Sequence, residues 1–501
     1  RTSVILYTKT MFPSLLRTSL RHGVSLRVGA ATPVGLSSAL QQRFFSAEKI
    51  EESTSKDSST KTTTTTTTKI AETPQAAADD NDYSGKKYES LPISFADISR
   101  AEVAIRGGVK RTQCEKSHFI SELVGANVFF KPEFRQFTGS FKERGARNAI
   151  LQLMREKKDA LKGVIAASAG NHAQALAYHG QQLGVPATVV MPTVAPMSKV
   201  DRCRKFGARV IIHGAHIGEA KEFAETLVEN EGLVYVNGYD DPPILAGAGT
   251  IGMEIIDDVP DVDVVVVPVG GGGLIAGISC AIKTLKPDCK VIGVEAEFCA
   301  SYTAAMKAGR PVPAPFTPTL ADGLAVPIVG SQAFEVARHF VDDCMLATEK
   351  QIALAVLRLL ENEKIVVEGG GATGLAALLP GGALDRPDMK GKNIVVPLCG
   401  GNIDTTVLGR VIDRGLAADI RLVNFCVTVS DRPGGIAKMT AILSEEGASI
   451  KDIYHERAWL HSSVDQVQCR VVVELQGREH AQRVKTALLS RGYPVIWNSD
   501  M

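Results

Sequence analysis

Between residues 89 and 418, short uninterrupted apolar runs alternate with longer stretches of helical pattern. A strand that is apolar along its whole length belongs inside a parallel sheet whose two faces are covered by helices. We therefore expect a large α/β domain over residues 89–418. The strands expected within it are 163–167, 187–191, 208–212, 262–269, 290–294 and 393–398.

The pattern changes after about residue 420, where strands and helices no longer alternate one by one. The order strand, helix, strand, strand, helix, strand is that of a ferredoxin-like βαββαβ unit. Residues 421–501 are enough for such a unit and too few for a second catalytic domain, so a separate small domain is expected there. Its elements are expected at 423–429, 436–446, 449–456, 466–475, 478–491 and 494–497.

The first 45 residues contain six Lys or Arg and no Asp or Glu. This composition is typical of a mitochondrial transit peptide, and Arg43 leads a site for a matrix protease near Phe45 and Ser46. We therefore expect the mature protein in the mitochondrial matrix; a plastid signal and a basic tail are the alternatives. Residues 46–88 are rich in Thr and poor in large apolar groups, which predicts a disordered linker.

Charge and cysteine usage exclude several classes of function. The whole chain carries +1, and since residues 1–45 contribute six positive charges, the remainder is near −5. That remainder has no basic footprint for nucleic acid or a membrane surface, and no run approaches the roughly 20 apolar residues that span a bilayer. The nine cysteines are scattered without metal-ligand spacing, so we expect reduced thiols in an intracellular protein and no metal site.

Four glycines, Gly270 to Gly273, follow the longest apolar strand and precede a helix. Glycines let backbone N–H groups approach an anion at the positive end of a helix, which predicts a phosphate site. The spacing Gly271-x-Gly273-x-x-Ala276, with Glu295 after the next strand, also satisfies a dinucleotide fingerprint. This segment alone therefore leaves an NAD-dependent oxidoreductase open, as well as a tight turn without any ligand.

Lys142 favours a different cofactor. It follows Gly139-Ser140-Phe141 where a helix is expected to begin, so the helix dipole and an apolar flank can lower the pKa of its amine. Such a lysine can bond covalently to a carbonyl group and later carry a proton, whereas most lysines are solvated surface charges.

Two further turns follow apolar strands. Residues 168–172 open a helix and can offer N–H groups to a carboxylate, although Asn171 alone could be a helix cap. Cys399 heads the turn 399–402 and could otherwise be a small core residue. Ligands bind at the carboxyl ends of strands in open α/β sheets, so we expect these turns to lie at one site. Such a site favours pyridoxal phosphate (PLP) over NAD, because it combines a lysine, a glycine turn for a phosphate, a loop for a carboxylate and a thiol.

Together these motifs resemble fold-type-II PLP enzymes, the tryptophan-synthase-β-like class, and within it the threonine and serine dehydratases. The resemblance covers residues 89–415, with every motif in the family's order. The C-terminal unit, opening at 431–437 (DRPGGIA), resembles an ACT regulatory domain, and the combination is similar to the single-ACT form of threonine ammonia-lyase. The motifs are 140–146 (SFKERGA), 168–172 (SAGNH), 270–274 (GGGGL), 368–372 (EGGGA) and 399–402 (CGGN).

The resemblance implies β-elimination of L-threonine to 2-oxobutanoate and ammonia, in isoleucine biosynthesis or threonine catabolism, and of L-serine to pyruvate. Lys142 would bind the cofactor and remove the Cα proton. The other residues implied to contact the cofactor are Phe141, Asn171, Gly270, Gly271, Gly272, Gly273, Leu274 and Cys399. Those implied to receive the substrate carboxylate are Ser168, Ala169, Gly170 and His172.

The family also implies a homo-oligomer, a dimer or a tetramer, and an amino-acid effector at the ACT domain. Candidate effector contacts there are Asp431, Gly434 and Gly435. Glu368 is expected near the pocket without an assigned step.

Three positions depart from relatives of this kind. Serine racemases place a serine with acid/base function where this chain has Ala169, which cannot exchange a proton. Relatives that bind a divalent cation have an Asp where this chain has Ser301, six positions after Glu295, so no metal is expected. Cys399 replaces the commoner serine, and a thiol is a weaker hydrogen-bond partner. An L-serine dehydratase or a serine-racemase-like enzyme remains the alternative within this fold.

Overall fold

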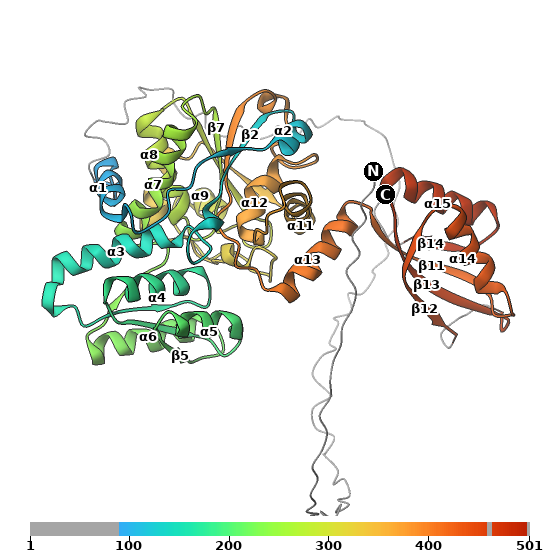
Figure 1. Ribbon diagram of the computed structural model, residues 1–501, viewed down its shortest axis with the longest axis horizontal. Coiled ribbons are helices and arrows are strands. Elements are labelled where there is room, and N and C mark those ends of the chain that lie inside the picture. Colours follow the sequence, from blue (N-terminus) through green and yellow to red (C-terminus); the bar gives the residue numbers. More distant parts are fainter. Residues whose placement is uncertain (1–89, 458–462, 498–501) are drawn as a thin grey trace, which may run out of the picture. The chain divides into compact units, whose positions relative to one another are not determined.

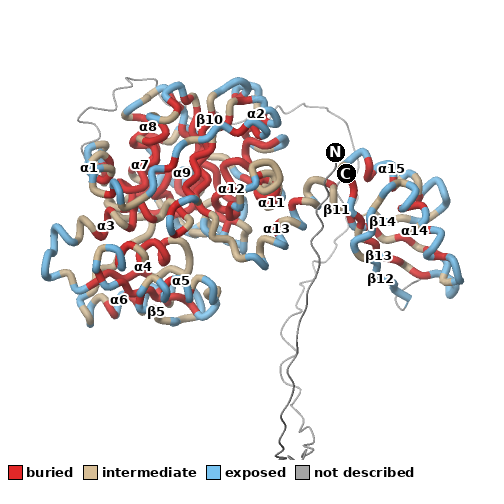
Figure 2. The backbone as a smooth tube through the Cα atoms, viewed as in Figure 1, coloured by how far each residue is buried: buried red, intermediate tan, exposed pale blue. Residues whose placement is uncertain are grey.

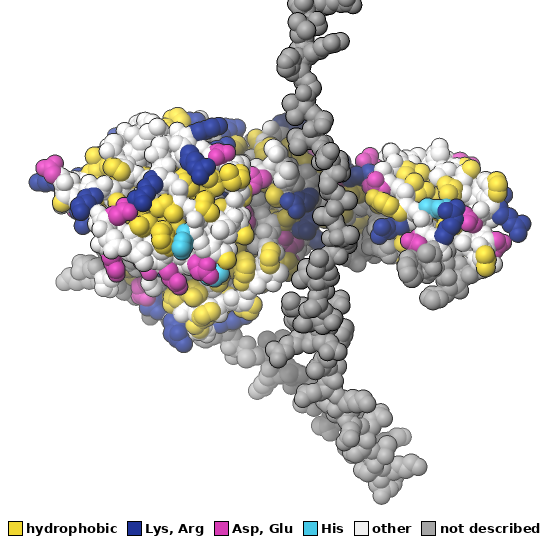
Figure 3. All heavy atoms as spheres, turned by 90° about the horizontal axis from the view of Figure 1, so that it is seen from below, with side chains coloured by type: hydrophobic (Ala, Val, Ile, Leu, Met, Phe, Trp, Pro, Cys, Tyr) yellow, Lys and Arg dark blue, Asp and Glu magenta, His cyan; other side chains and the backbone are white. Residues whose placement is uncertain are grey.

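The computed structural model describes residues 90–457 and 463–497 (Figure 1). The predicted transit peptide and the Thr-rich linker therefore lie outside the described residues. Over the described ranges, none of the helices combines the length and the apolar character that crossing a bilayer requires. On the face drawn in Figure 3, acidic and basic side chains are interspersed rather than gathered by sign, in keeping with the low net charge.

The larger sheet of the α/β domain has six strands in the order β1-β2-β10-β7-β8-β9. All neighbours are parallel except the β1–β2 pair. The expected strands 262–269, 290–294 and 393–398 are confirmed within it. The six strands are β1 (Glu115–Lys116), β2 (Asn127–Lys131), β7 (Val264–Pro268), β8 (Lys290–Ala296), β9 (Asp343–Ala347) and β10 (Asn393–Pro397).

Alternate residues of the central strand β7 face opposite cores, because side chains along a strand point alternately to the two faces. Val265 and Val267 face one helical layer, and Val264 and Val266 face the other. Figure 2 shows how fully these layers bury the sheet. The first layer is formed by α1 (Phe95–Ile105), α7 (Pro242–Asp258), α8 (Gly273–Leu285), α9 (Ser301–Ala308) and α10 (Ser331–Phe340). The second is formed by α2 (His118–Val124), α11 (Glu349–Arg358), α12 (Gly369–Leu378) and α13 (Thr405–Ala418).

A smaller parallel sheet has the order β5-β4-β3-β6, and the expected strands 163–167, 187–191 and 208–212 are confirmed in it. The strands are β3 (Val164–Ala167), β4 (Ala187–Met191), β5 (Arg209–Ile212) and β6 (Val234–Tyr235). The helices are α3 (Lys142–Lys157), α4 (Asn171–Leu183), α5 (Met197–Lys205) and α6 (Ile217–Glu231). Figure 1 shows these helices in turquoise to green.

Short helical turns connect several of these elements. The 3-10 turns are η2 (Glu133–Arg135), η3 (Lys158–Ala160), η4 (Asp322–Leu324) and η6 (Pro387–Met389), and η5 (Leu359–Glu363) is π-helical.

The C-terminal unit is an antiparallel sheet of order β12-β13-β11-β14 with two helices, which confirms the expected βαββαβ order. Alternation in β11 sends Val423, Phe425 and Val427 into its core, where the Phe425 ring stacks on Trp497 at 4.9 Å. The fold class is therefore the predicted one, two parallel sheets followed by a ferredoxin-like unit. Its elements are β11 (Leu422–Ser430), α14 (Gly435–Glu445), β12 (Ser449–Glu456), β13 (Gln466–Glu474), α15 (Arg478–Ser490) and β14 (Val495–Trp497).

Candidate active site

Lys142 is the first residue of α3, as the sequence predicted. Its Nζ donates a hydrogen bond to the carbonyl of Gly238 at 2.6 Å and lies 4.9 Å from the centre of the Phe141 ring. Burial lowers the pKa of the Lys142 amine to about 8, against the opposing influence of Cys399 and Glu368. A larger share of this amine is therefore neutral and nucleophilic near neutral pH than is usual for lysine.

The glycine turn joins β7 to α8, whose N-terminal end it forms. Gly272 has a φ of 90°, a left-handed conformation that favours glycine. A Cβ at Gly271 would lie 2.4 Å from the Tyr239 ring, and one at Gly273 would lie 2.3 Å from the Tyr239 carbonyl oxygen. The turn is thus packed so closely against Tyr239 that only glycine fits at these two positions. The first N–H groups of α8 have no acceptor within the helix, so the turn suits a phosphate.

Asn171 begins α4, and the cap of that helix is Gly170, which makes no side-chain cap bond. Interpreting Asn171 as a helix cap is therefore wrong. Its amide instead donates to Glu368 Oε1 at 2.6 Å and accepts from Asn402 Nδ2 at 2.9 Å. The side chain of Asn171 thus lies among the residues of two other predicted motifs.

The neighbouring loop residues lie after β3, where a carboxylate site was expected. The Ser168 hydroxyl accepts from the Gly170 N–H at 3.3 Å. The imidazole of His172 is buried against the Val236 carbonyl, 2.9 Å from Nε2, and burial with the nearby Lys142 charge lowers its pKa to about 4. Since that ring stays neutral and turned to Val236, a carboxylate at this loop would be bound by backbone N–H groups.

Cys399 follows β10 and is 5% exposed. Its Sγ lies 3.3 Å from the Pro397 carbonyl oxygen. Burial, with the charges of Glu133 and Glu368, raises the pKa of the thiol well above its usual value. The group is therefore a neutral thiol near neutral pH.

Glu368 lies behind Gly400, where a Cβ would be 2.3 Å from Glu368 Oε1. Burial and the Asp322 charge raise the pKa of this carboxyl to about 7. The sequence predicted that Glu368 lies near the pocket but assigned it no step of the reaction. The hydrogen bond between Glu368 and Asn171 now connects Glu368 to the site.

Backbone contacts bring these segments together. Phe141 N–H donates to the Cys399 carbonyl at 3.0 Å, and Ser140 forms an isolated bridge with Gly400. The lysine is thereby held beside the turn after β10 of the larger sheet, while Asn171 comes from the smaller sheet. The turns after β3 and β10, the start of α3 and the start of α12 are thus in contact with one another. The glycine turn after β7 joins them through Tyr239, the neighbour of Gly238, which accepts the bond from Lys142.

Gly238 gave no sequence signal as a site residue, because it follows a strand of only two residues, β6. Its carbonyl nevertheless accepts the bond from Lys142.

Glu295, the acidic residue of the dinucleotide interpretation, does not point to a ligand. Its carboxylate accepts from the N–H groups of Tyr302 at 2.7 Å and Thr303 at 2.9 Å, and from the Thr303 hydroxyl at 2.6 Å. These bonds hold the start of α9 and occupy both oxygens. The Glu295 carboxylate is therefore not free to bind the ribose of NAD, as the dinucleotide interpretation required.

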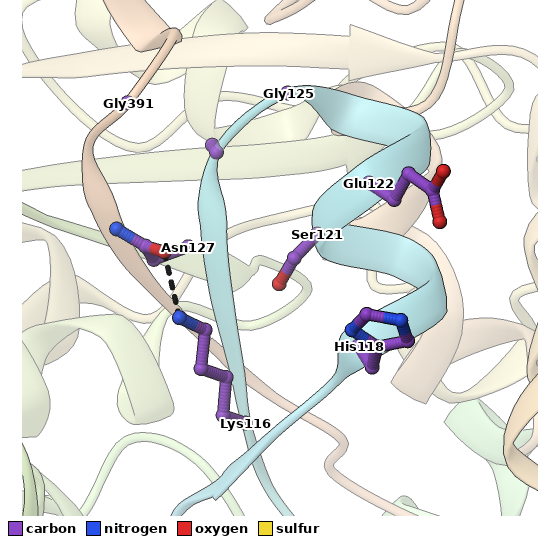
Figure 4. Close-up of a pocket in the computed structure, with 8 residues that line it drawn as sticks. Lys116, His118, Ser121, Glu122, Gly125, Asn127 and Gly391 are labelled. Atoms are coloured by element: carbon purple, nitrogen blue, oxygen red, sulfur yellow. Dashed lines mark hydrogen bonds between the residues drawn. The ribbon is translucent and has the colours of Figure 1, made fainter.

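A shallow hollow elsewhere on the large domain holds none of the predicted site residues (Figure 4). It lies beside α2, the edge strand β1 and its neighbour β2, where Lys116 donates to Asn127 Oδ1 at 2.7 Å. Its lining residues are Lys116, His118, Ser121, Glu122, Gly125, Ala126, Asn127 and Gly391.

The residues between the two sheets fit pyridoxal phosphate. They supply a lysine amine of lowered pKa, a glycine turn at a helix N-terminus for the phosphate, and a neutral thiol. Within the described ranges, two buried polar atoms at the site, Ser140 Oγ and His172 Nδ1, have no hydrogen-bond partner. Since buried polar groups are nearly always bonded, such atoms indicate room for a polar ligand.

Comparisons with known proteins agree with this geometry. The model of the family described as pyridoxal-phosphate dependent enzyme matches residues 105–400. L-Threonine ammonia-lyase of Thermotoga maritima is 42% identical over 403 residues, 80% of this chain and 99% of that protein. The same enzyme of Geobacter sulfurreducens is 42% identical, over 81% and 99% of the two chains.

Solved structures show the same likeness. The processed form of threonine deaminase isoform 2 from Solanum lycopersicum is 36% identical with a TM-score of 0.60, over 64% of this chain and 92% of that chain. Maize serine racemase is 32% identical with a TM-score of 0.61, over 65% and 98% of the two chains.

Proposed function

The chain belongs to the pyridoxal-phosphate-dependent enzyme family, and from this premise we propose that it eliminates ammonia from L-threonine to form 2-oxobutanoate. The observation that carries the proposal is the buried Lys142 amine of lowered pKa, whose Nζ bonds the Gly238 carbonyl next to the Tyr239 that packs against the glycine turn. L-Serine, which lacks only the methyl group, is the expected second substrate and yields pyruvate. The reaction serves isoleucine biosynthesis or threonine breakdown.

The residues of the site divide the chemistry among them. When bound, pyridoxal phosphate supplies an electron sink for the pair left on Cα. The Lys142 amine would take the Cα proton, and the N–H groups of the glycine turn would hold the cofactor's phosphate. The backbone N–H groups of residues 168–170 orient the substrate carboxylate. Cys399 would offer the cofactor's ring nitrogen a neutral thiol, which would not hold that nitrogen protonated and would favour loss of the β-hydroxyl.

An assay of 2-oxo acid and ammonia with L-threonine and with L-serine tests this function. We expect equal amounts of both products from threonine, and chiral analysis of the serine reaction is expected to find no D-serine, because Ala169 offers no proton. Rapid racemisation without oxo acid would instead make the protein a racemase. No reaction with either substrate in a cofactor-loaded protein would overturn the proposal.

We propose that the C-terminal unit is an ACT domain that binds an amino-acid effector. Supporting this, Gly434 has a φ of 90° and α14 begins at Gly435, so its first N–H groups can meet a carboxylate. The Asp431 carboxylate pairs with Arg457, whose Nε lies 2.8 Å away. ACT units bind ligands where two of them pair, so the protein is a homo-oligomer, a dimer or tetramer, which light scattering can determine.

Isoleucine or valine is therefore expected to change the rate or the KM for threonine by about fivefold or more, the usual range of allosteric coupling. The measurement is a titration of each amino acid against the full chain and against a variant ending at residue 418. The shortened variant is expected to remain active and unresponsive. An equal response from both forms would leave the C-terminal unit without a regulatory role.

We also propose that the protein acts in the mitochondrial matrix, since residues 1–45 are basic and free of acid. The mature chain is then expected to begin near Ser46. Terminal sequencing of protein purified from the organelle checks this, and native protein that still begins before Arg43 would contradict it.

A further inference from the structure

A chain of hydrogen bonds leads from the surface of α5 to the candidate active site. Arg202 Nη1 donates to Asn402 Oδ1 at 2.6 Å. Asn402 Nδ2 donates to Asn171 Oδ1 at 2.9 Å, and Asn171 Nδ2 donates to Glu368 Oε1 at 2.6 Å. Arg202 is exposed and Glu368 is buried, so the chain runs from solvent to the interior through the two amides.

The first amide of this chain can adopt only one orientation. A guanidinium only donates hydrogen bonds and a backbone carbonyl only accepts them. Asn402 Oδ1 faces Arg202, and its Nδ2 faces the carbonyl of Thr138 at 2.7 Å as well as Asn171. Reversal of the Asn402 amide would set donor against donor at Arg202 and acceptor against acceptor at Thr138. Gly139 leaves the space for this arrangement, because a Cβ there would lie 2.6 Å from Asn402 Oδ1.

The orientation passes on to the second amide. Because Asn402 presents a donor, the oxygen of the Asn171 amide must face it, and the Asn171 NH₂ group must face the opposite way. One of those two hydrogens goes to Glu368. The other is left for the cofactor, and a donor at that point stabilises an ionised oxygen.

Helix α5 is seated against the same region by two more contacts. Ser198 Oγ donates to Asp404 Oδ1 at 2.6 Å, and Lys199 lies 3.6 Å from the carboxylate of Asp322. Arg202 also donates to Gln174 Oε1 at 3.0 Å, which ties it to α4. The guanidinium is therefore held by partners on two elements rather than being a free surface charge.

We propose that Arg202 is a positioning residue for the elimination reaction, acting through Asn402 to orient the Asn171 amide so that its NH₂ group faces the cofactor. The inference rests on the proposed cofactor and reaction. Without the guanidinium, the Thr138 carbonyl alone holds the Asn402 amide, so the reversed orientation of the two amides costs less than in the wild type. In the reversed orientation an Asn171 oxygen faces the ring oxygen of pyridoxal phosphate and repels it.

The test is Arg202→Met in the full-length protein loaded with pyridoxal phosphate. We expect cofactor binding, measured by equilibrium dialysis, to weaken about three- to tenfold, the effect of one charge-assisted bond acting at a distance. The pH at which the bound cofactor's absorption band changes is expected to rise by up to about one unit, because the ionised ring oxygen loses its donor. Asn402→Asp should shift the band in the same direction, since a carboxylate cannot donate to Asn171.

Two controls separate this role from others. Arg204→Met removes an exposed guanidinium of α5 that pairs only loosely with Asp201, at 3.5 Å, and should change neither readout. Gln174→Met removes the other partner of Arg202 and should have little effect on the band. The inference is overturned if Arg202→Met leaves both the band and cofactor binding unchanged, or if Gln174→Met reproduces its effects. A wild-type protein that binds the cofactor without eliminating ammonia would refute the proposed function. Cofactor binding and the pH dependence of the absorption band would then still test the role of Arg202.

Discussion

Replacing Lys142 with alanine is expected to abolish ammonia release from threonine, lowering kcat by on the order of a thousandfold or more. The residue would carry two functions at once, the covalent hold on the cofactor and the base that takes the Cα proton. Cys399, Glu368 and His172 are ionisable groups close to it, and a thiol of strongly raised pKa is a poor substitute for the amine.

The measurement compares oxo-acid formation and the cofactor absorption spectrum of Lys142→Ala with those of the wild type. Lys157→Ala is the matched control, because Lys157 is the exposed last residue of the same helix α3. It should keep wild-type turnover. Undiminished activity in a folded Lys142→Ala protein would remove the basis of the active-site assignment.

Arg144→Met is expected to lower the free energy of unfolding by about 3–5 kcal/mol, the cost of leaving a buried charge without its partner. Arg144 is fully buried two residues after the active-site lysine. Its guanidinium binds Glu133 through two bonds of 2.7 and 2.8 Å and Glu254 through two of 2.7 and 2.9 Å. Methionine has the length to fill the space and cannot pair with either carboxylate.

The loss of stability in Arg144→Met is expected to depend on pH. Burial alone would raise the pKa of Glu133, but the Arg144 guanidinium outweighs it and holds that pKa below its usual value. In the wild type, Glu133 therefore adds stability above its unfolded pKa, and this stability is lost as the pH falls through the lowered one. In Arg144→Met the carboxyl can take up a proton instead, so the difference between the two proteins should shrink below about pH 4.5.

Urea unfolding followed by circular dichroism measures the difference at neutral and at acid pH. Tryptophan fluorescence would not serve, because both tryptophans of the chain follow residue 450 and report on the C-terminal unit. Arg155→Met, at an exposed position of the same helix, is the control and should stay within about 0.5 kcal/mol of the wild type. A similarly small change for Arg144→Met would show that the buried pair contributes little.

The sequence predicted the strands best where they are apolar on both faces. β4 has the expected bounds, and β3, β7, β8 and β10 differ by a few residues. β12 also has the expected bounds, although nearly all of its residues are exposed. Burial in a parallel sheet leaves a continuous apolar run that is easy to recognise. β2 and β9 were not predicted, because they include Lys131 and Asp343 and lie towards the sheet edge.

The individual motifs of the site were readable, but the contacts between them were not. Each turn can be recognised in the sequence from its glycines after a strand. The bond between Asn171 and Glu368 joins residues 197 positions apart, so it follows only from how the two sheets meet. The same holds for Arg202, which in the sequence is one of several charges on an exposed helix. Pairwise contacts over such separations leave no periodic signal in a single chain.

The most direct test of the central claim is to locate the cofactor on the chain. Borohydride fixes pyridoxal phosphate to the lysine that holds it, and peptide mass spectrometry then identifies that lysine among the Lys residues of the protein. We expect the label on the peptide containing residues 139–146, at Lys142, and its loss when threonine is present during reduction. Label spread over exposed lysines, or concentrated on a different one, would contradict the account.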